Sequence, residues 1–340
     1  MIRRFRGWGL SLSLRGLGRR KQWAPAWASL ALVAACASAP EPDVYVAGFE
    51  SNGHFDVATV WKNGAATSLT DGTGHAHATG VAVDGADVHV CGVGLVTTAV
   101  GQALAAALWK NGVAVPLRTT SPVSFASAVA VQGHDVYVAG TDGNVATVWK
   151  NGEPTALTTG LSDAQGIALS GADVYVVGSE SIGRAVTPRV WKNGAATSLP
   201  QTFDLAGAAA VAVQGGSVFI AGNDGPYAIY WKDGVRVALT DGVFDAGARG
   251  IAFAAGRVLV AGTEGNGQDP VAKLWVDGLP NDLSFGSGGG GSEAIATVGG
   301  DVYVAGFTPT FAGYWKNGRL TPLTNGRSGA NALAIAVVPR

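Results

Sequence analysis

Residues 135–152 read DVYVAGTDGNVATVWKNG, and this stretch contains the pattern that decides the fold. It holds two apolar, strand-like runs, and an Asn-Gly pair follows the second run. Asn-Gly between two strand-like runs is the strongest short signal of a β-hairpin, because a type I′ turn needs a positive φ at both central positions. The stretch therefore predicts neighbouring strands of an antiparallel sheet.

The same pattern recurs along the chain at regular intervals. Its mark is a tryptophan that opens a Trp-Lys-Asn-Gly turn or a close variant of it. The seven copies of this mark begin at Trp61, Trp109, Trp149, Trp191, Trp231, Trp275 and Trp315. A spacing of 40 to 48 residues, with several short strands in each interval, is typical of a β-propeller. We therefore expect an all-β fold, a seven-bladed β-propeller with four antiparallel strands in each blade, as a single domain over residues 43–340.

Each repeat contains four short strands, which we name a, b, c and d in chain order. Strand b, the Val-Tyr-Val-Ala-Gly run, is apolar at nearly every residue, as expected for a strand with a neighbouring blade on each face. In a propeller the a–b and c–d turns lie on one face of the ring, which we name the bottom face. The b–c loops and the connections from d to the next a lie on the other face, the top face. The tryptophans are expected to fill the gaps between blades.

The two ends of the repeat region complement one another. The region begins at Asp43 with a strand b, and residues 331–337 form a run of the strand-a kind. Pairing of these two segments would close the ring and leave no open sheet edge at the seam. We therefore expect the C-terminal strand to join the first blade.

The first 35 residues have the features of an export signal rather than of the fold. They contain seven basic residues, no acid, and a short apolar stretch that ends in small residues. That stretch is too short to span a bilayer. The sequence predicts a signal peptide over residues 1–35 and a tether over residues 36–42.

Residues 32–36, LVAAC, resemble the lipobox of bacterial lipoproteins. The resemblance implies that Cys36 is lipidated and becomes the first residue of an exported, membrane-anchored protein; the alternative is ordinary cleavage nearby, which leaves a free thiol. Ala37 stands where an aspartate is associated with inner-membrane retention, which favours the outer membrane. The repeats from Asp43 to Val338 look like those of bacterial repeat lipoproteins built on a propeller, and this resemblance implies the fold only.

Removal of the signal changes the charge of the chain. Without its seven basic residues, 16 basic residues remain against 24 acidic ones, a formal charge of −8. Such an acidic body repels nucleic acid, so we expect no nucleic-acid partner. Cys91 stands where other repeats have alanine, which predicts a small buried side chain without a disulfide. We expect a monomer that is held on the membrane by its lipid and has a protein or glycan partner.

The bottom face is expected to carry lysines of the c–d turns and aspartates that begin strand b. The lysines are Lys62, Lys110, Lys150, Lys192, Lys232 and Lys316. The aspartates are Asp43, Asp87, Asp135, Asp173 and Asp301. The lysines either contact anionic lipid headgroups or simply keep the hairpin tips soluble, with the aspartates cancelling most of their field. We expect each aspartate to bond its own turn backbone.

The residues just before strand a should face the mouth of the central funnel. They are Thr79, Ser127, Gln165, Ala209, Arg249, Glu293 and Leu333. A second row, two residues earlier, includes Asp163 and Asn331. A small-ligand site at this rim would use the polar members Gln165, Asp163, Arg249, Glu293 and Asn331. The alternative is a solvated rim, in which Arg249 and Glu293 form a surface pair of little energetic value.

Three of the five histidines, His54, His75 and His77, fall in neighbouring top-face loops. Histidines two apart on an extended segment point to the same side, and a third from a nearby loop could complete a zinc or copper set. The alternative is a group of polar loop residues without any cofactor.

The sequence contains neither a Gly-x-Ser-x-Gly elbow nor a phosphate-binding Gly-x-x-x-x-Gly-Lys loop. It favours a membrane-anchored, non-catalytic binding or interaction scaffold that presents its top-face loops to a partner. The alternative is a polysaccharide- or peptide-cleaving hydrolase or lyase with its site in the central funnel, since the top face is rich in acids.

Overall fold

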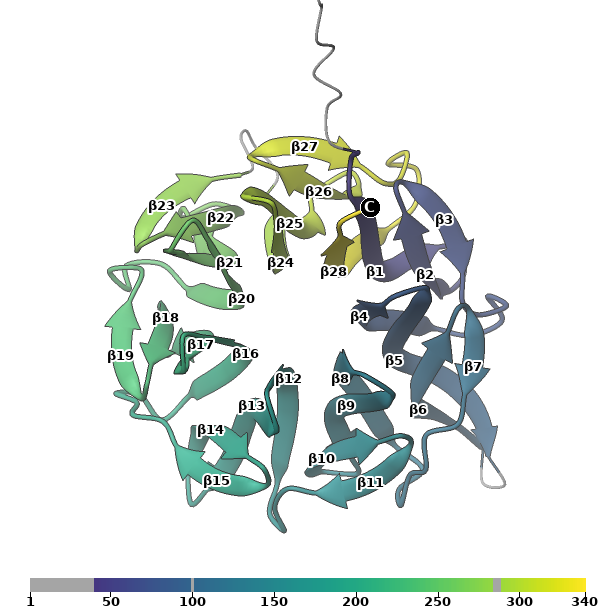
Figure 1. Cartoon of the computed structure of the whole chain (residues 1–340), viewed down its shortest axis with the longest axis horizontal. Coiled ribbons are helices and arrows are strands. Elements are labelled where there is room, and N and C mark those ends of the chain that lie inside the picture. The colour runs from purple at the N-terminus through teal and green to yellow at the C-terminus, as the bar shows by residue number, and fades with distance from the viewer. Residues whose placement is uncertain (1–39, 99–100, 284–288) are drawn as a thin grey trace, which may run out of the picture. The chain divides into compact units, whose positions relative to one another are not determined.

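The computed structural model describes residues 40–98, 101–283 and 289–340, and Pro40–Arg340 form one compact unit. Seven four-stranded antiparallel sheets surround a central axis, and each sheet is one blade (Figure 1). The expected seven-bladed β-propeller is therefore confirmed. Over these described ranges no helix is long and apolar enough to cross a bilayer. The predicted signal peptide and Cys36 lie outside the described residues.

The inner half of each blade consists of a strand a and a strand b. The a strands, which surround the axis, are β4 (Ala76–Asp84), β8 (Ser124–Gln132), β12 (Ser162–Ser170), β16 (Ala206–Gln214), β20 (Ala246–Ala254), β24 (Gly291–Val298) and β28 (Ala330–Val338). The b strands are β1 (Asp43–Ser51), β5 (Asp87–Thr98), β9 (Asp135–Asp142), β13 (Asp173–Ile182), β17 (Ser217–Asp224), β21 (Arg257–Gly265) and β25 (Asp301–Phe307).

The outer half of each blade consists of a strand c and a short strand d. The c strands are β2 (Asp56–Lys62), β6 (Gly101–Lys110), β10 (Val145–Lys150), β14 (Ala185–Lys192), β18 (Tyr227–Lys232), β22 (Pro270–Val276) and β26 (Ala312–Lys316). The d strands are β3 (Ala65–Ser68), β7 (Val113–Val115), β11 (Glu153–Ala156), β15 (Ala195–Ser198), β19 (Val235–Ala238), β23 (Leu279–Asp282) and β27 (Arg319–Pro322).

The ring is closed by the last strand of the chain. β28 pairs antiparallel with β1, and the register places Val44 opposite Val337 and Ala47 opposite Ala334. The first blade therefore consists of β28, β1, β2 and β3, from the axis outward. This confirms the expected seam, because the C-terminal strand supplies the inner strand that the first repeat lacks.

The tryptophans of the repeats are buried between neighbouring blades, as expected. Trp231 of the fifth blade is fully buried and packs with Tyr175 and Val177 of the fourth blade. Trp61 of the first blade packs in the same way against Tyr303 and Ala305 of the seventh blade. The side chain that marks each repeat in the sequence therefore joins that repeat to the one before it.

The Asn-Gly and Asp-Gly turns are held in place by one recurring contact. The first turn residue has a φ between 49° and 53° in all seven blades, as a type I′ turn requires. Its side-chain oxygen accepts a hydrogen bond from the backbone N–H of the second residue of strand b, for example from Val174 to Asn193 at 2.8 Å. The turn between strands c and d thus also caps strand b.

The aspartates that begin strand b do not bond their own turn backbone, so that expectation is wrong. Asp173 accepts a hydrogen bond from the Asn193 amide at 2.8 Å and pairs with the Lys192 ammonium at 2.7 Å. All five aspartates pair in this way, because the c–d turn lies beside the start of strand b and offers charged donors. In the sixth blade the charges are exchanged, and Arg257 pairs with Asp277.

Candidate functional site

Each inner strand contains one β-bulge at the same position of the repeat. In β12, Ala164 pairs with Gly178 and Gly166 pairs with Val177, which leaves Gln165 as the extra residue. The extra residues of the seven strands are Thr79, Ser127, Gln165, Ala209, Arg249, Glu293 and Leu333. A bulge re-aims a side chain away from the regular pleat. These seven residues are the ones that the repeat alignment predicted to face the funnel mouth. All seven line a central channel of about 400 Å³.

The glycine of the Val-Tyr-Val-Ala-Gly run is what allows the bulge. A Cβ atom added to Gly178 would lie 2.1 Å from the backbone oxygen of Asp163, on the inner strand. At the corresponding glycines of the other six blades this distance would be 1.9 to 2.1 Å. Strands a and b therefore approach so closely beside the bulge that only glycine fits there.

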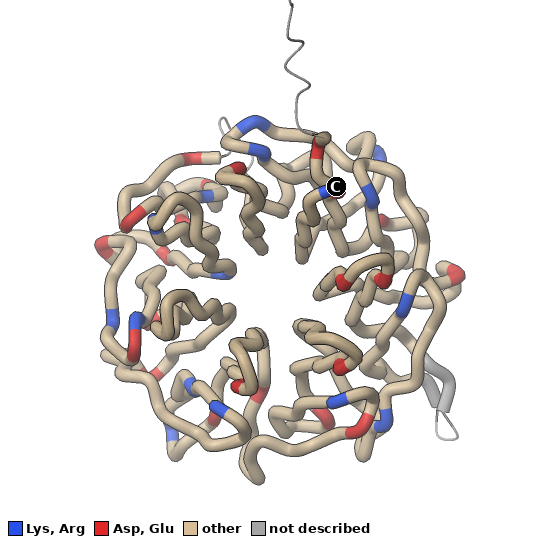
Figure 2. Tube along the Cα trace, viewed as in Figure 1, with Lys and Arg blue, Asp and Glu red and all other residues tan. Residues whose placement is uncertain are grey.

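The channel carries two charged residues on neighbouring inner strands, Arg249 on β20 and Glu293 on β24. Within the described part of the chain neither side chain forms a hydrogen bond or an ion pair. Burial raises the pKa of the Glu293 carboxyl above its usual value, and the charge of Arg249 partly opposes this effect. Charged residues otherwise lie mostly away from the inner strands (Figure 2).

We expect Glu293 to impose a pH dependence on stability that Gln at this position removes. Because the folded protein favours the protonated carboxyl, the free energy of unfolding should fall as pH rises from the ordinary value of 4.5 through the raised folded pKa. Urea unfolding of the wild type and of Glu293→Gln, from about pH 3 to about pH 8, measures this difference. All other titrating groups are common to both proteins, so parallel pH profiles would contradict the assignment.

The remaining residues of the predicted rim do not join Arg249 and Glu293 in one cluster. Gln165 donates a hydrogen bond from Nε2 to Asp163 at 2.8 Å, and Asp163 also accepts one from the Ser179 backbone at 2.7 Å. Asn331 lies opposite Phe49 in the first blade, with its side-chain oxygen buried and without a partner. The structure thus divides the predicted rim into separate polar groups in different blades.

A second hollow, of about 520 Å³, lies on the top side, mainly between the first, second and third blades, and Gln165 of the fourth blade completes its lining. We name it the blade 1–3 cavity. Its lining residues are Asp56, His75, Ala76, His77, Thr79, Val93, Leu104, Phe125, Ala126, Ser127, Thr141 and Gln165. Of the predicted site residues, His75, His77 and Gln165 line it. Thr79 and Ser127 were predicted to face the funnel mouth, and sequence reasoning missed the remaining lining residues, since they occupy different repeat positions and share no local motif.

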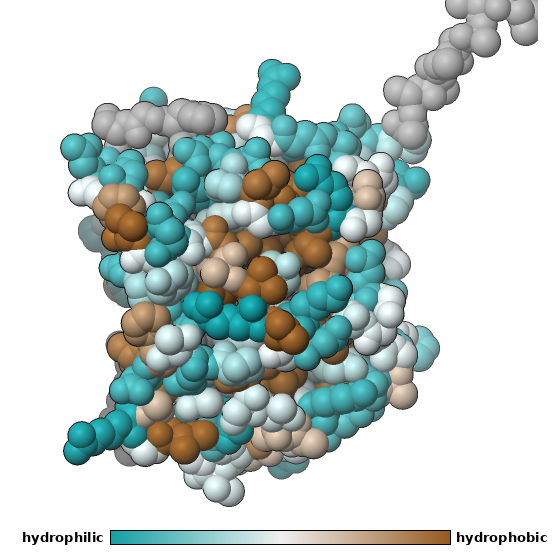
Figure 3. Space-filling view, turned by 90° about the vertical axis from the view of Figure 1, so that its left-hand side faces the viewer, coloured by the Kyte–Doolittle hydropathy of each residue, from teal (hydrophilic) through white to brown (hydrophobic). Residues whose placement is uncertain are grey.

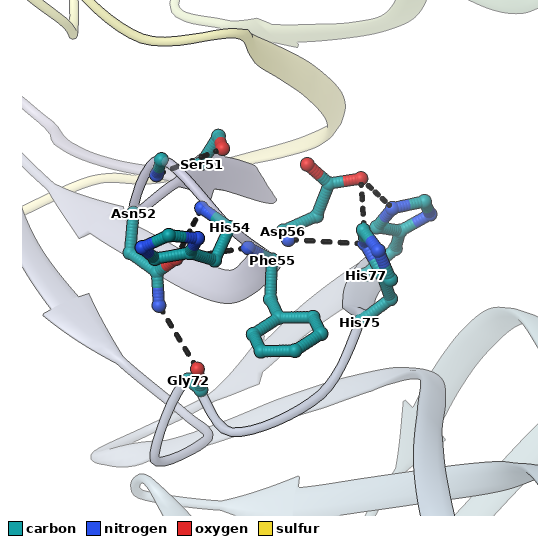
Figure 4. A network of polar contacts seen from close by, with 9 residues as sticks. Ser51, Asn52, His54, Phe55, Asp56, Gly72, His75 and His77 are labelled. Atoms are coloured by element: carbon teal, nitrogen blue, oxygen red, sulfur yellow. Dashed lines mark hydrogen bonds and ion pairs between the residues drawn. The ribbon is translucent and has the colours of Figure 1, made fainter.

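Asp56, His75 and His77 are part of the cavity lining. The two histidine rings lie beside the Asp56 carboxylate (Figure 4). His77 Nε2 lies 3.0 Å and His75 Nδ1 3.4 Å from Asp56 Oδ2. His75 Nδ1 also accepts a hydrogen bond from the Asp56 backbone N–H at 3.2 Å. Phe49 stacks on His77 with ring centroids 4.3 Å apart, and Phe55 meets His75 edge-on at 5.3 Å.

The loop before β2 explains why His54 does not take part in this group. The Asn52 side-chain oxygen accepts hydrogen bonds from the backbone N–H groups of His54 and Phe55, and the side-chain amide nitrogen donates one to the Gly72 carbonyl. This loop holds the His54 ring apart from His75 and His77 (Figure 4). Among the residues that the structure describes, no three His, Cys, Asp or Glu side chains are arranged to hold a metal ion. The three histidines proposed as zinc or copper ligands are therefore not brought together.

The top face also exposes large apolar side chains. They are Val123, Phe125, Leu161, Ile182, Phe203, Leu205, Val243 and Phe244. All eight lie at or next to b–c loops or d–a connections. On the outer wall of the ring, apolar side chains are scattered among polar ones (Figure 3). The top face thus combines variable loops, exposed apolar groups and a cavity.

This architecture defines the protein as a seven-bladed β-propeller. Comparisons with known proteins support this fold and assign no function. No protein-family model matches the sequence, and no curated protein sequence matches it. Similar solved structures include a Bacteroides uniformis protein provisionally described as a 6-phosphogluconolactonase, with 13% identity and a TM-score of 0.54 over 88% of this chain and 100% of that one.

Two further structures are less similar. A chain of a nidogen/laminin complex has 9% identity and a TM-score of 0.42, over 87% of this chain and 98% of that one. Hydrazine synthase of Kuenenia stuttgartiensis has 11% identity and a TM-score of 0.49, over 88% of this chain and 48% of that one. Identities this low carry no residue roles.

Proposed function

We propose that this protein is a lipid-anchored, non-catalytic binding protein of the bacterial cell envelope, which recognises a protein or glycan through its top face. The observation that carries the proposal is the distribution of variation among the repeats. The c–d turns of the bottom face repeat nearly the same residues and contacts in every blade. The top face instead differs from blade to blade in its bulge residues, its loops and its exposed apolar side chains. A regular scaffold with one variable face is the usual design of a binding protein.

The attachment of the tether supports an orientation for this protein. Glu41 of the tether pairs with Lys316 of a c–d turn at 2.7 Å, so the chain that leads from Cys36 joins the ring at the bottom face. Lipid on Cys36 would then hold the bottom face towards the membrane, most simply the outer membrane, and leave the top face free. Labelled palmitate should be incorporated by the wild type and not by Cys36→Ser, and incorporation by the serine variant would contradict the anchor.

Matched substitutions on the two faces test the recognition surface. Leu205 on the top face and Leu279 beside a bottom-face turn are 66% and 67% exposed, so aspartate at either position should leave the fold intact. Binding to peptide and glycan arrays should fall about tenfold or more for Leu205→Asp and stay unchanged for Leu279→Asp. Equal losses in the two variants would contradict the proposal.

The same arrays test the enzyme alternative. A polysaccharide- or peptide-cleaving hydrolase or lyase in the channel would depend on Glu293, the one acid among the described channel-lining residues and one whose pKa is raised. Turnover of an array member that Glu293→Gln abolishes would replace the binding proposal by the enzymatic one.

A further inference from the structure

The blade 1–3 cavity has an apolar wall with an aromatic ring that is open to solvent. Val93, Leu104 and Phe125 line this wall, and Phe125 is 37% exposed. The backbone of Phe125 is part of the β8–β9 ladder, where it pairs with Thr141, and its carbonyl oxygen lies against Gly140 beside the bulge. An exposed aromatic face carries partial negative charge and attracts the C–H groups of a ligand that packs on it.

Beside this wall, with Thr141 directly across from Phe125 in the β8–β9 ladder, the cavity offers polar groups whose bonding capacity is not used up. His75 Nδ1 accepts from the Asp56 backbone, so the neutral ring carries its proton on Nε2. Gln165 uses its amide nitrogen on Asp163, which leaves its oxygen as an acceptor. The hydroxyls of Ser127 and Thr141 line the cavity without a hydrogen bond to any described residue.

The apolar and polar groups of the lining together determine which class of ligand fits the cavity. A purely apolar ligand would bury the hydroxyls, the amide and the imidazole without partners, at a cost of about 1–3 kcal/mol for each group. A strongly cationic ligand would find only Asp56 as an acid in the lining, and Asp56 Oδ2 already lies 3.0 Å from His77 Nε2. A neutral molecule with an apolar C–H face and several hydroxyls satisfies both sides of the cavity.

We propose that the blade 1–3 cavity binds one neutral sugar residue of a glycan, with its C–H face on Phe125 and its hydroxyls at the Ser127, Thr141 and Gln165 edge. The inference rests on the proposed binding function and names the ligand class for it. Thr79, Ser127 and Gln165 line both this cavity and the central channel, so further sugar residues can continue towards the axis. The cavity volume of about 520 Å³ is within the usual range for ligand pockets.

The test uses the purified full-length chain in a sugar-free detergent. The probes are the methyl glycosides of glucose, galactose and N-acetylglucosamine and their β-linked trisaccharides, with acetyl-arginine amide as the cationic comparison. Binding is followed by saturation-transfer NMR and titration calorimetry. We expect at least one neutral glycoside to bind, with contacts from its C–H face, and the arginine derivative not to bind.

Phe125→Ala should weaken glycoside binding about tenfold or more, and Phe244→Ala, at a top-face phenylalanine outside the cavity with 41% exposure, should leave it unchanged. Ser127→Ala should weaken it less, because one hydrogen bond is lost. The inference is overturned if no neutral glycoside binds, if Phe125→Ala binds equally well, or if only the arginine derivative binds. If the sugar site fails in one of these ways, a selective loss of array binding in Leu205→Asp would still support recognition through the top face. The experiments therefore distinguish failure of the sugar site from failure of the proposed function.

Discussion

A chain that ends at Gly329 should not form the native ring. β28 is the inner strand of the first blade, and its Ala332, Ala334 and Ile335 are buried beside Trp61 and Trp109. Without β28, one edge of β1 has no hydrogen-bonding partner strand. The two hydrophobic cores beside the first blade also lose the side chains that β28 contributes. We expect this loss to be as large as the whole stability of an average domain, about 5–15 kcal/mol. Circular dichroism and urea unfolding should show no cooperative transition.

A shorter deletion and a complementation experiment control for nonspecific effects. Removal of Pro339 and Arg340 alone loses an exposed ion pair between Arg340 and Asp43, and should cost less than about 1 kcal/mol. A synthetic peptide of residues 330–340 should restore the transition of the truncated chain by adding the missing strand to β1. A truncated chain that unfolds cooperatively without the peptide would show that the seam is not needed.

Alanine in place of Gly178 should be the most damaging substitution of a single methyl group in the fourth blade. The new Cβ would lie 2.1 Å from the Asp163 carbonyl oxygen and 2.9 Å from the Ala164 Cα atom, and both are backbone atoms that cannot move independently. We expect the free energy of unfolding to fall by about 3 kcal/mol, the upper part of the range for overpacked sites. The midpoint of urea unfolding measures this change.

Gly247 provides the matched control, because it lies on inner strand β20 and an added Cβ would meet no atom within 4 Å. Gly247→Ala should be neutral or stabilising by up to about 1 kcal/mol, since it reduces the freedom of the unfolded chain. Similar losses at Gly178 and Gly247 would mean that the close approach beside the bulge does not explain the glycine of the repeat.

The fold was predictable because its signals are local and occur seven times. The Asn-Gly turns, the apolar b strands and the marker tryptophans are each recognisable from a few consecutive residues, and the structure confirms each of them. The closure of the ring followed from the order of the strands at the two ends of the repeats. Cys91 is buried without a disulfide, and burial raises the pKa of its thiol to about 12.

The site was only partly predictable. The alignment of the repeats placed Gln165, Arg249 and Glu293 at the channel, although only the structure showed that a bulge beside the repeat glycine turns them towards it. The structure does not bring His54 together with His75 and His77, because a loop conformation set by Asn52 determines where the His54 ring lies. Asp56 was not among the predicted site residues, yet it lies beside both histidines.

The sequence by itself determined the number of blades, the strand order, the turn conformations and the seam, because each of these depends on short-range patterns repeated along the chain. Only the tertiary structure decided which unlike residues of the first four blades surround one cavity, and how burial acts on Glu293. Those properties depend on distances between residues of different repeats. Such distances follow from the twist and packing of whole blades, which no local pattern encodes.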